Sequence, residues 1–188
     1  MSKEYKPPYV KKILVSSRKV KKGIKKAAKW LDDKFMSRKT TPIFVSVLKG
    51  SLPFYGEVVK HIHFDVLFDC IAISSYKGKI TSTSKPKIIS DLTNDVKGKD
   101  VVVIEDVVDR GNTLSLLVSL LKKRKAKSVT VMVLVDKSDM RTVPFKPDYV
   151  CFELLHDPFL IGWGLDYNEK ARNLPYIAEF DKSYIDRI

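Results

Sequence analysis

Three nearly continuous apolar runs, within residues 43–48, 99–105 and 129–135, most constrain how this chain can fold. They do not alternate apolar with polar residues, as a strand with one solvated face would. Stretches with apolar residues at helical spacing separate them, after residue 51 and again from residue 113. Strands buried on both faces and joined by helices are typical of a parallel sheet covered on each side. The sequence therefore predicts an α/β fold with a central parallel sheet flanked by helices.

The N-terminal segment predicts one strand and one long helix. Residues 10–15 (VKKILV) indicate a short strand, and Ser16 or Ser17 can cap a helix that extends to about residue 36. One face of this helix is apolar, at Val20, Ile24, Ala27, Leu31 and Phe35. Most of the nearby lysines fall outside that stripe, so we expect them on a solvated face.

The length of 188 residues predicts one domain. Short strands are expected near residues 148–153 and 159–165, followed by irregular structure. We expect a core of about residues 37–150 and a small accessory lobe, the hood, from about residues 1–16 and 151–188. The hood would lie over the edge of the sheet.

Composition narrows the possible compartments and partners. No segment approaches the roughly 18 unbroken apolar residues of a membrane span, and the charged N-terminus has no apolar signal region. We therefore expect a cytoplasmic protein without a membrane partner. The formal net charge of +13 favours anionic partners: nucleic acid, a membrane surface or phosphorylated small molecules. A solvated helix face explains the lysines of residues 21–29 at least as well as a nucleic-acid site does.

The most informative stretch is VVVIEDVVDRGNTL, residues 101–114. Two adjacent carboxylates, Glu105 and Asp106, are costly to desolvate at a strand end unless they face ribose hydroxyls or a hydrated cation. Gly111 permits a tight turn, and the free amides at the start of the next helix favour phosphate. Thr113 adds a hydroxyl donor. An ordinary strand, turn and helix with a capping Asp would fit the same spacing.

Further polar segments are expected at the same edge of the sheet, because ligands bind at the carboxyl ends of parallel strands. These strand ends carry residues 49–51 (KGS), residues 105–113, and the pair Asp136 and Lys137. Residues 77–86 (KGKITSTSKP) are polar and contain Gly and Pro, which predicts a flexible loop of the kind that is often functional. We expect these segments to form one ligand site.

Residues 101–114 resemble the signature that binds phosphoribosyl pyrophosphate (PRPP) in type I phosphoribosyltransferases. That signature has an apolar strand, two acids, two apolar residues and then Asp-Thr/Ser-Gly-x-Thr. Residues 47–51 (VLKGS) resemble the family's pyrophosphate loop, and Lys137 matches its purine-recognition lysine. Residues 158–177 (PFLIGWGLDYNEKARNLPYI) are similar to the hypoxanthine-guanine branch of bacterial type. The matching segments occur in the family's order and span nearly the whole chain.

One residue departs from the family pattern. Arg110 stands where the family usually has Thr or Ser, so a side-chain hydroxyl to the phosphate is missing while the backbone amide remains. The guanidinium of Arg110 can pair with phosphate itself, project outward or fill the pocket.

The resemblance implies a role for each residue of the signature. Glu105 and Asp106 would hold the ribose hydroxyls and help position Mg²⁺. Asp109 would lie at purine N7, either as a general base or as a carboxylate that stabilises positive charge in the transition state. The phosphate would be bound by Arg110, Gly111, Asn112 and Thr113.

The resemblance also implies roles outside the signature. Pyrophosphate would be bound by Lys49, Gly50 and Arg172, with a non-proline cis peptide between Leu48 and Lys49. Ser75 and Tyr76 would begin a mobile lid that excludes water during the reaction. The purine would contact Lys137, the ring of Phe159 and the backbone of Leu160. Asp166 would reach a second Mg²⁺ or support contacts to the base edge, although an Asp here also suits a turn.

Together these features imply a purine salvage enzyme. It would transfer the 5-phosphoribosyl group of PRPP to N9 of hypoxanthine or guanine, giving IMP or GMP and pyrophosphate, and the family implies a homodimer or homotetramer. Two alternatives remain open. One is a PRPP-sensing, nucleic-acid-binding regulator on the same fold, which the +13 charge supports but the lack of an appended DNA-binding segment disfavours. The other is an enzyme that prefers another base, such as xanthine or uracil.

Overall fold

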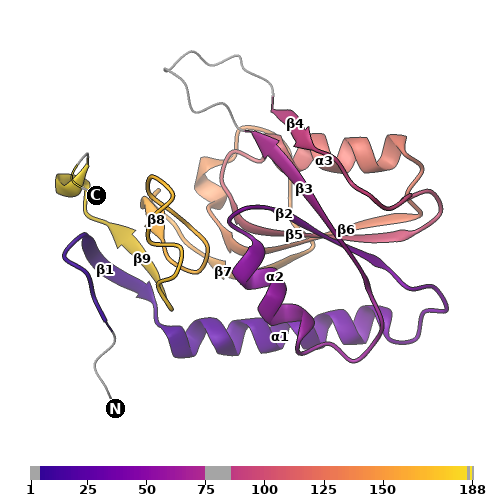
Figure 1. The fold of residues 1–188 in the computed structure, drawn as a ribbon, viewed down its shortest axis with the longest axis horizontal. Helices are drawn as coiled ribbons and strands as arrows, with labels where there is room; N and C mark the ends of the chain where they lie inside the picture. The colour runs from indigo at the N-terminus through magenta and orange to yellow at the C-terminus, as the bar shows by residue number, and fades with distance from the viewer. Residues whose placement is uncertain (1–4, 75–85, 186, 188) are drawn as a thin grey trace.

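A computed structural model describes residues 5–74, 86–185 and 187. Within these ranges six strands form one sheet, in the order β4 (Lys87–Ser90), β3 (Leu67–Ser74), β2 (Ile43–Leu48), β5 (Asp100–Val108), β6 (Ser128–Asp136) and β7 (Tyr149–Glu153). A separate sheet contains β1 (Val10–Val15), β9 (Ile177–Phe180) and β8 (Leu160–Ile161). Figure 1 shows the smaller sheet as a lobe beside the larger one. The predicted α/β architecture with a hood is confirmed.

The larger sheet is parallel except at one edge. β3, β2, β5, β6 and β7 run in the same direction, whereas β4 is antiparallel to β3. The connecting helices are α1 (Ser17–Phe35), α2 (Leu52–Val59) and α3 (Asn112–Lys123), with single 3-10 turns η1 (Ser138–Met140) and η2 (Lys182–Tyr184). No helix in the described ranges combines the length and apolar character needed to cross a bilayer.

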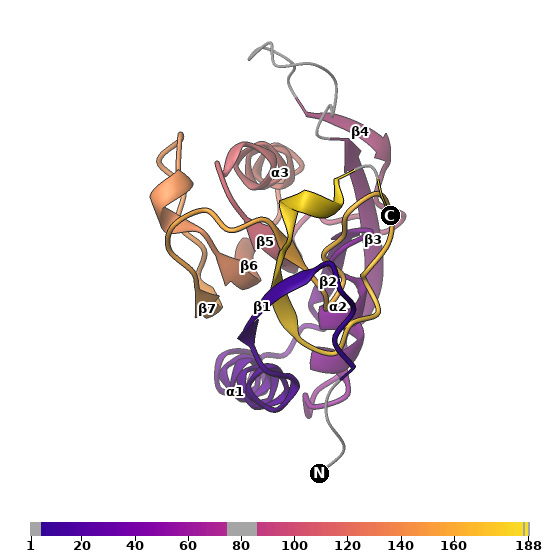
Figure 2. The same ribbon diagram turned by 90° about the vertical axis from the view of Figure 1, so that its left-hand side faces the viewer.

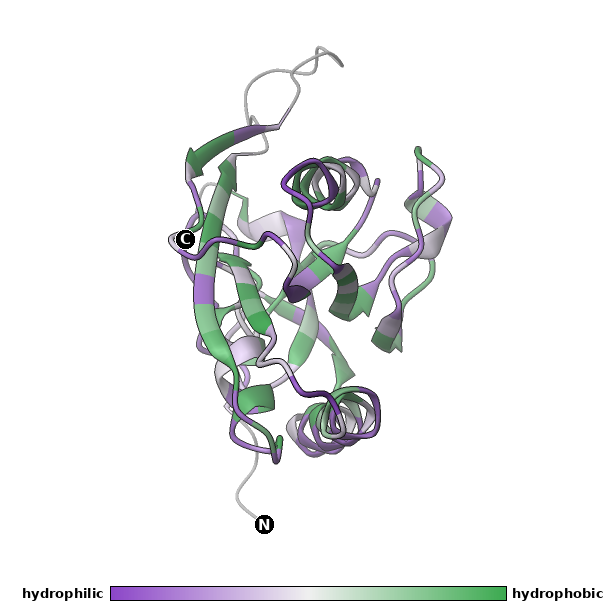
Figure 3. Ribbon diagram, turned by 90° about the vertical axis from the view of Figure 1, so that its right-hand side faces the viewer, coloured by the Kyte–Doolittle hydropathy of each residue, from purple (hydrophilic) through white to green (hydrophobic). Residues whose placement is uncertain are grey.

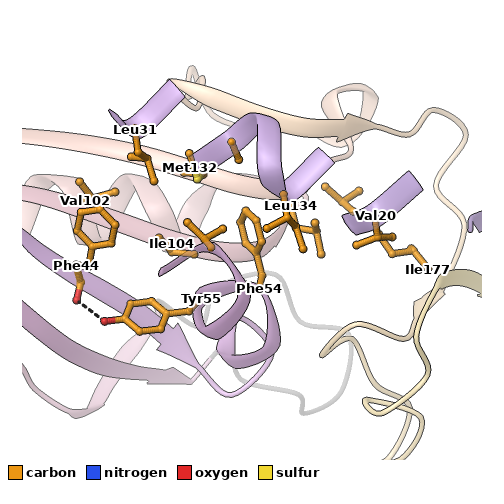
Figure 4. Packing of buried hydrophobic residues seen from close by; sticks show 14 of the residues in the cluster. Val20, Leu31, Phe44, Phe54, Tyr55, Val102, Ile104, Met132, Leu134 and Ile177 are labelled. Atoms are coloured by element: carbon orange, nitrogen blue, oxygen red, sulfur yellow. Dashed lines mark hydrogen bonds between the residues drawn. The ribbon is translucent and has the colours of Figure 1, made fainter. Parts of the chain in front are cut away.

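Helices cover both faces of the larger sheet, which explains its continuous apolar strands. One set of strand residues packs against α1 and α2, and Figure 4 shows members of this cluster: Phe44, Val102, Ile104, Met132 and Leu134, with Val20, Leu31 and Phe54 from the helices. The next residues along the strands, such as Val45 and Val103, pack against Leu114 and Leu117 of α3. Figure 2 shows the sheet between α1 and α3, and Figure 3 shows the hydrophobic strands in the interior.

We expected the strand near residues 148–153 to belong to the hood. This expectation is wrong, because the strand belongs to the larger sheet. β7 pairs parallel with β6, with Tyr149 opposite Met132. The physical reason is that β7 is apolar on both faces. Tyr149 and Phe152 pack on the α1 side, whereas Val150 packs on the α3 side. Such a strand belongs in a sheet that is covered on both sides, and the hood therefore begins after Glu153.

The hood also contains a strand where we expected irregular structure. β9 pairs antiparallel with β1, with Val10 opposite Phe180, and with β8, with Leu160 opposite Glu179. It joins the two ends of the chain because both contribute to one small core, formed by Val10, Ile161, Ala171, Leu174, Tyr176, Ala178 and Phe180. The N-terminal strand can be buried only against a partner from the far end of the sequence.

Candidate functional site

The signature segment lies mostly in strand β5, not in a turn. The apolar run that predicted this strand lies within residues 99–105, but the ladder with β6 continues to Val107 and Val108, which lie opposite Val135 and Asp136. The strand continues because the two valines after the acid pair, Val107 and Val108, are favourable strand residues and pair with β6. The turn is short, and Gly111 ends it with a φ of 86° directly before α3.

The acid pair at the end of β5 carries poorly compensated negative charge. Glu105 is buried, with 8% of its surface exposed. Burial raises the pKa of Glu105 well above its usual value, and the neighbouring Asp106 carboxylate raises this pKa further. The Asp106 amide donates a hydrogen bond to Glu105 Oε1 at 3.1 Å, and the Val107 amide donates to Asp106 Oδ1 at 2.8 Å. A bound cation would stabilise both carboxylates in their ionised form.

The predicted pyrophosphate loop lies directly against the acid pair. The peptide between Leu48 and Lys49 is cis, as the resemblance implied. A Cβ atom at position 50 would lie 1.8 Å from Asp106 Oδ2, so only glycine lets the loop come this close. The Ser51 hydroxyl donates to the Val47 carbonyl at 2.6 Å, which holds the loop closed from within.

The hood brings Arg172 to the same loop. Arg172 Nη1 lies 3.1 Å from Asp166, and this nitrogen also donates to the Gly164 carbonyl at 2.6 Å. Glu169 links the two predicted pyrophosphate ligands, because it accepts from Lys49 at 3.0 Å and from Arg172 at 3.2 Å. Lys49 and Arg172 are 123 residues apart in sequence, yet one carboxylate joins them.

The predicted phosphate loop, residues 109–113, leaves one acceptor without a partner. Asp109 Oδ1 is buried and has no hydrogen-bond partner among the described residues. A buried carboxylate oxygen without a donor is costly, so the site favours a ligand that supplies one. Arg110 is exposed, which agrees with the outward orientation among the three that we considered. Asn112 is exposed and Thr113 partly buried at the start of α3.

The predicted purine-binding residues lie on either side of the junction between sheet and hood. Lys137 is buried at the end of β6, with 7% of its surface exposed, and its ammonium pairs with Asp157. Phe159 is 42% exposed, although its ring contacts Tyr167 and Phe180. Leu160 is buried in β8. An exposed aromatic ring and a buried ammonium are the kinds of group that bind a flat, polar heterocycle.

The third predicted metal ligand has other contacts. Asp166 pairs with Arg172 and accepts a hydrogen bond from the Glu169 amide at 2.9 Å, so it also forms the turn that we considered. No cluster of three or more His, Cys, Asp or Glu residues suited to a metal ion occurs in the described part of the chain. Two carboxylates still fit Mg²⁺, which commonly takes one or two from the protein and its other ligands from substrate phosphates and water.

Some predicted positions cannot be placed, and some important residues were not predicted. Ser75, Tyr76 and the loop to residue 85 lie outside the described residues. Glu169, Asp157 and Arg141 contact the site but did not stand out in the sequence, because each acts through a residue distant along the chain. The Asp157-Pro158 pair is a turn signal, yet nothing in it indicates contact with Lys137.

Comparison with known proteins identifies relatives over most of the chain. Residues 11–170 match the model of the phosphoribosyl transferase domain. The hypoxanthine-guanine phosphoribosyltransferase of Mycoplasma genitalium is 38% identical over 172 residues, which is 92% of this chain and 97% of that protein. The Bacillus subtilis protein of the same name is 42% identical over 169 residues, covering 90% and 92% of the two chains.

A solved structure agrees with the same assignment. A hypoxanthine phosphoribosyltransferase from Staphylococcus aureus superposes with a TM-score of 0.87 at 32% identity, covering 93% of this chain and 94% of that one. The similarity includes the hood as well as the sheet, because it extends over nearly the full length of both chains.

Proposed function

This chain belongs to the phosphoribosyl transferase family, and from this premise we propose that it is a purine salvage enzyme acting on hypoxanthine and guanine. It transfers the 5-phosphoribosyl group of PRPP to N9 of the base and releases pyrophosphate. The observation that carries the proposal is the meeting of three groups at one edge of the sheet. They are the acid pair in the last part of β5, the loop of Lys49 and Gly50, and the buried Lys137.

PRPP binds along this edge through its three parts. Glu105 and Asp106 hold the ribose hydroxyls, and the 5′-phosphate lies on the amides of the turn before α3. The residues that bind this phosphate are Arg110, Gly111, Asn112 and Thr113. Lys49, Gly50 and Arg172 bind the pyrophosphate, whose charge grows as the bond to C1′ breaks.

The reaction exchanges one bond at C1′ for another. The bond from C1′ to the pyrophosphate oxygen breaks, the bond from C1′ to N9 forms, and the base loses one proton, which passes to the Asp109 carboxylate or directly to water. Asp109 faces N7 of the purine, where its unpaired oxygen accepts a hydrogen bond from the base and stabilises its developing positive charge. Phe159 stacks on the ring, Leu160 contacts its edge through the backbone, and Lys137 donates to the 6-oxo group.

Mg²⁺ is the proposed cofactor. Glu105 and Asp106 would help to hold one ion, and Asp166 would reach a second if it exchanged its contact with Arg172 for the metal. When bound, the metal neutralises charge on the pyrophosphate. The protein residues keep their own tasks, since Lys49 and Arg172 supply fixed positive charge that does not depend on the metal.

A single assay tests the function. Purified protein is given PRPP and Mg²⁺ with hypoxanthine, guanine, xanthine, adenine or uracil, and nucleotide formation is followed by absorbance. We expect turnover with hypoxanthine and guanine, because Lys137 has donors for a 6-oxo group and no acceptor for the adenine amine. Efficient use of adenine or uracil would contradict the assignment. Preference for xanthine, or PRPP-dependent nucleic-acid binding without turnover, would favour the alternatives.

Glu169 leads to a prediction about pyrophosphate binding. Pyrophosphate must take Lys49 and Arg172 away from this carboxylate. Glu169→Gln should therefore bind magnesium pyrophosphate more tightly, by about 3-fold, since exposed ion pairs are weak. Titration calorimetry measures the change.

Glu179→Gln is the matched control, because it removes the exposed pair with Lys11 elsewhere in the hood. Its affinity for magnesium pyrophosphate should equal that of the wild type. Weaker binding by Glu169→Gln would instead mean that Glu169 holds the two cations in their binding geometry.

The proposal also covers the oligomeric state of the protein and its cellular compartment. Several large apolar side chains are exposed on α2, β3 and β4, including Leu52, Phe68 and Ile89, with 49%, 59% and 72% of their surfaces accessible. Large exposed apolar side chains are typical of a protein interface, and we propose that the chain forms a homodimer or homotetramer. We also propose a cytoplasmic enzyme, because PRPP is too highly charged to cross a membrane unaided.

A further inference from the structure

A short segment after η1 lies against the phosphate loop. This brace, residues 141–145, follows the end of β6 and contacts residues 109–111 through both backbone and side chains. Arg141 Nη1 donates a hydrogen bond to the Asp109 carbonyl. The Thr142 amide donates to the Arg110 carbonyl at 3.2 Å. Two successive carbonyls of the phosphate loop are therefore bound to the brace.

These two hydrogen bonds also set the direction of two amides. In a trans peptide the carbonyl and the following N–H point in opposite directions. Because the Asp109 and Arg110 carbonyls point toward the brace, the amides of Arg110 and Gly111 point away from it. Neither amide donates a hydrogen bond to another described residue, so both can donate to an anion. Such backbone donors before a helix are suited to bind phosphate.

The brace packs closely against the loop at Gly111. A Cβ atom at Gly111 would lie 3.0 Å from Arg141 Cδ, 3.1 Å from Val143 Cγ2 and 3.2 Å from Phe145 Cβ. The Arg141 side chain is only 14% exposed and pairs with Asp136, whose side chain is 10% exposed. Asp136 directly precedes Lys137, so one guanidinium joins the phosphate loop to the strand end that carries the purine-recognition lysine.

We propose that Arg141 is a positioning residue for the 5′-phosphate of PRPP. Its guanidinium holds the Asp109 carbonyl so that the loop amides keep their direction, and it fixes the backbone that carries the Asp109 carboxylate. This inference rests on the proposed function. It assigns particular weight to the backbone, because the side chain of Arg110 is exposed.

The test separates the two anionic halves of the substrate. Arg141→Gln should weaken binding of ribose 5-phosphate by about 10-fold or more, because a charged donor to a partly buried carbonyl is lost. Binding of magnesium pyrophosphate should change by less than about 2-fold, since Lys49 and Arg172 lie on other segments and distant sites act additively. Both affinities are measured by calorimetry on protein whose folding is verified by circular dichroism.

Arg38→Gln is the matched control. Arg38 forms a comparable partly buried pair with Asp100, at 2.6 Å, but at the opposite end of β5. The Arg38→Gln variant should have a lower melting temperature than the wild type and the same affinity for ribose 5-phosphate and magnesium pyrophosphate. A loss of ribose 5-phosphate binding in both variants would mean that general destabilisation is the cause, and would overturn the proposal.

A second variant keeps the test decisive if Arg141→Gln does not fold. Arg141→Lys retains the charge but cannot span Asp136 and the Asp109 carbonyl with a planar fork. It should bind ribose 5-phosphate more weakly than the wild type and pyrophosphate equally well. Unchanged affinity for both ligands, or equal loss of both, would refute the positioning role. A wild-type protein that binds neither ligand would instead contradict the proposed function itself.

Discussion

Asp109→Asn is expected to lower kcat by about 100-fold or more, while the protein still folds and still binds PRPP. The buried Oδ1 of Asp109 has no hydrogen-bond partner within the described ranges, so its acceptor capacity is available to the substrate. The substitution keeps the size of the side chain but removes its charge and its capacity to take a proton. In the proposed binding mode PRPP makes its main contacts with the neighbouring amides and the acid pair, so its affinity should change little.

Steady-state kinetics with hypoxanthine and PRPP titration by calorimetry check this prediction. Asp139→Asn is a suitable control, because Asp139 is an exposed carboxylate on η1. We expect wild-type kinetics from it. Turnover of Asp109→Asn at the wild-type rate would exclude Asp109 from the mechanism.

Lys137→Met should raise the KM for hypoxanthine and guanine by at least about 100-fold, since sites built on matched hydrogen bonds reject a mismatch strongly. Methionine fills the space of the buried side chain but cannot donate to the 6-oxo group. The variant should not use adenine efficiently either, because methionine offers no acceptor for its amine. PRPP binding should change less, because the phosphate loop lies on the preceding strand and helix.

Asp157→Asn separates the ammonium from its partner. It keeps Lys137 but weakens the ion pair seen in the structure, and half of the Asp157 side-chain surface is exposed. We expect a smaller rise in KM than for Lys137→Met, with the same preference for 6-oxopurines. If Lys137→Met kept its kinetics for every base, Lys137 would only end a strand, and the base pocket would lie elsewhere.

Local sequence patterns were sufficient to predict the strands that consist of continuous apolar runs. The strands around Val45, Val103 and Val133 were predictable because an unbroken apolar run must be covered on both faces. The hood strands were harder. β9 is only four residues long, and it is stabilised by β1, whose residues lie about 165 positions earlier in the chain.

Some residues of the candidate site could likewise be identified from the sequence, whereas others were found only in the tertiary structure. The sequence by itself identified the acid pair and the glycine turn, because each motif is contiguous and its possible chemistry follows from residue type and spacing. Lys49-Gly50 was identified through the family resemblance of its segment. Only the tertiary structure decided that Glu169 joins Lys49 to Arg172, that Asp157 meets Lys137, and that Arg141 holds the phosphate loop. These contacts join residues that are distant in the sequence. A contact of this kind depends on the tertiary fold, and no periodic pattern of residues in the sequence indicates it.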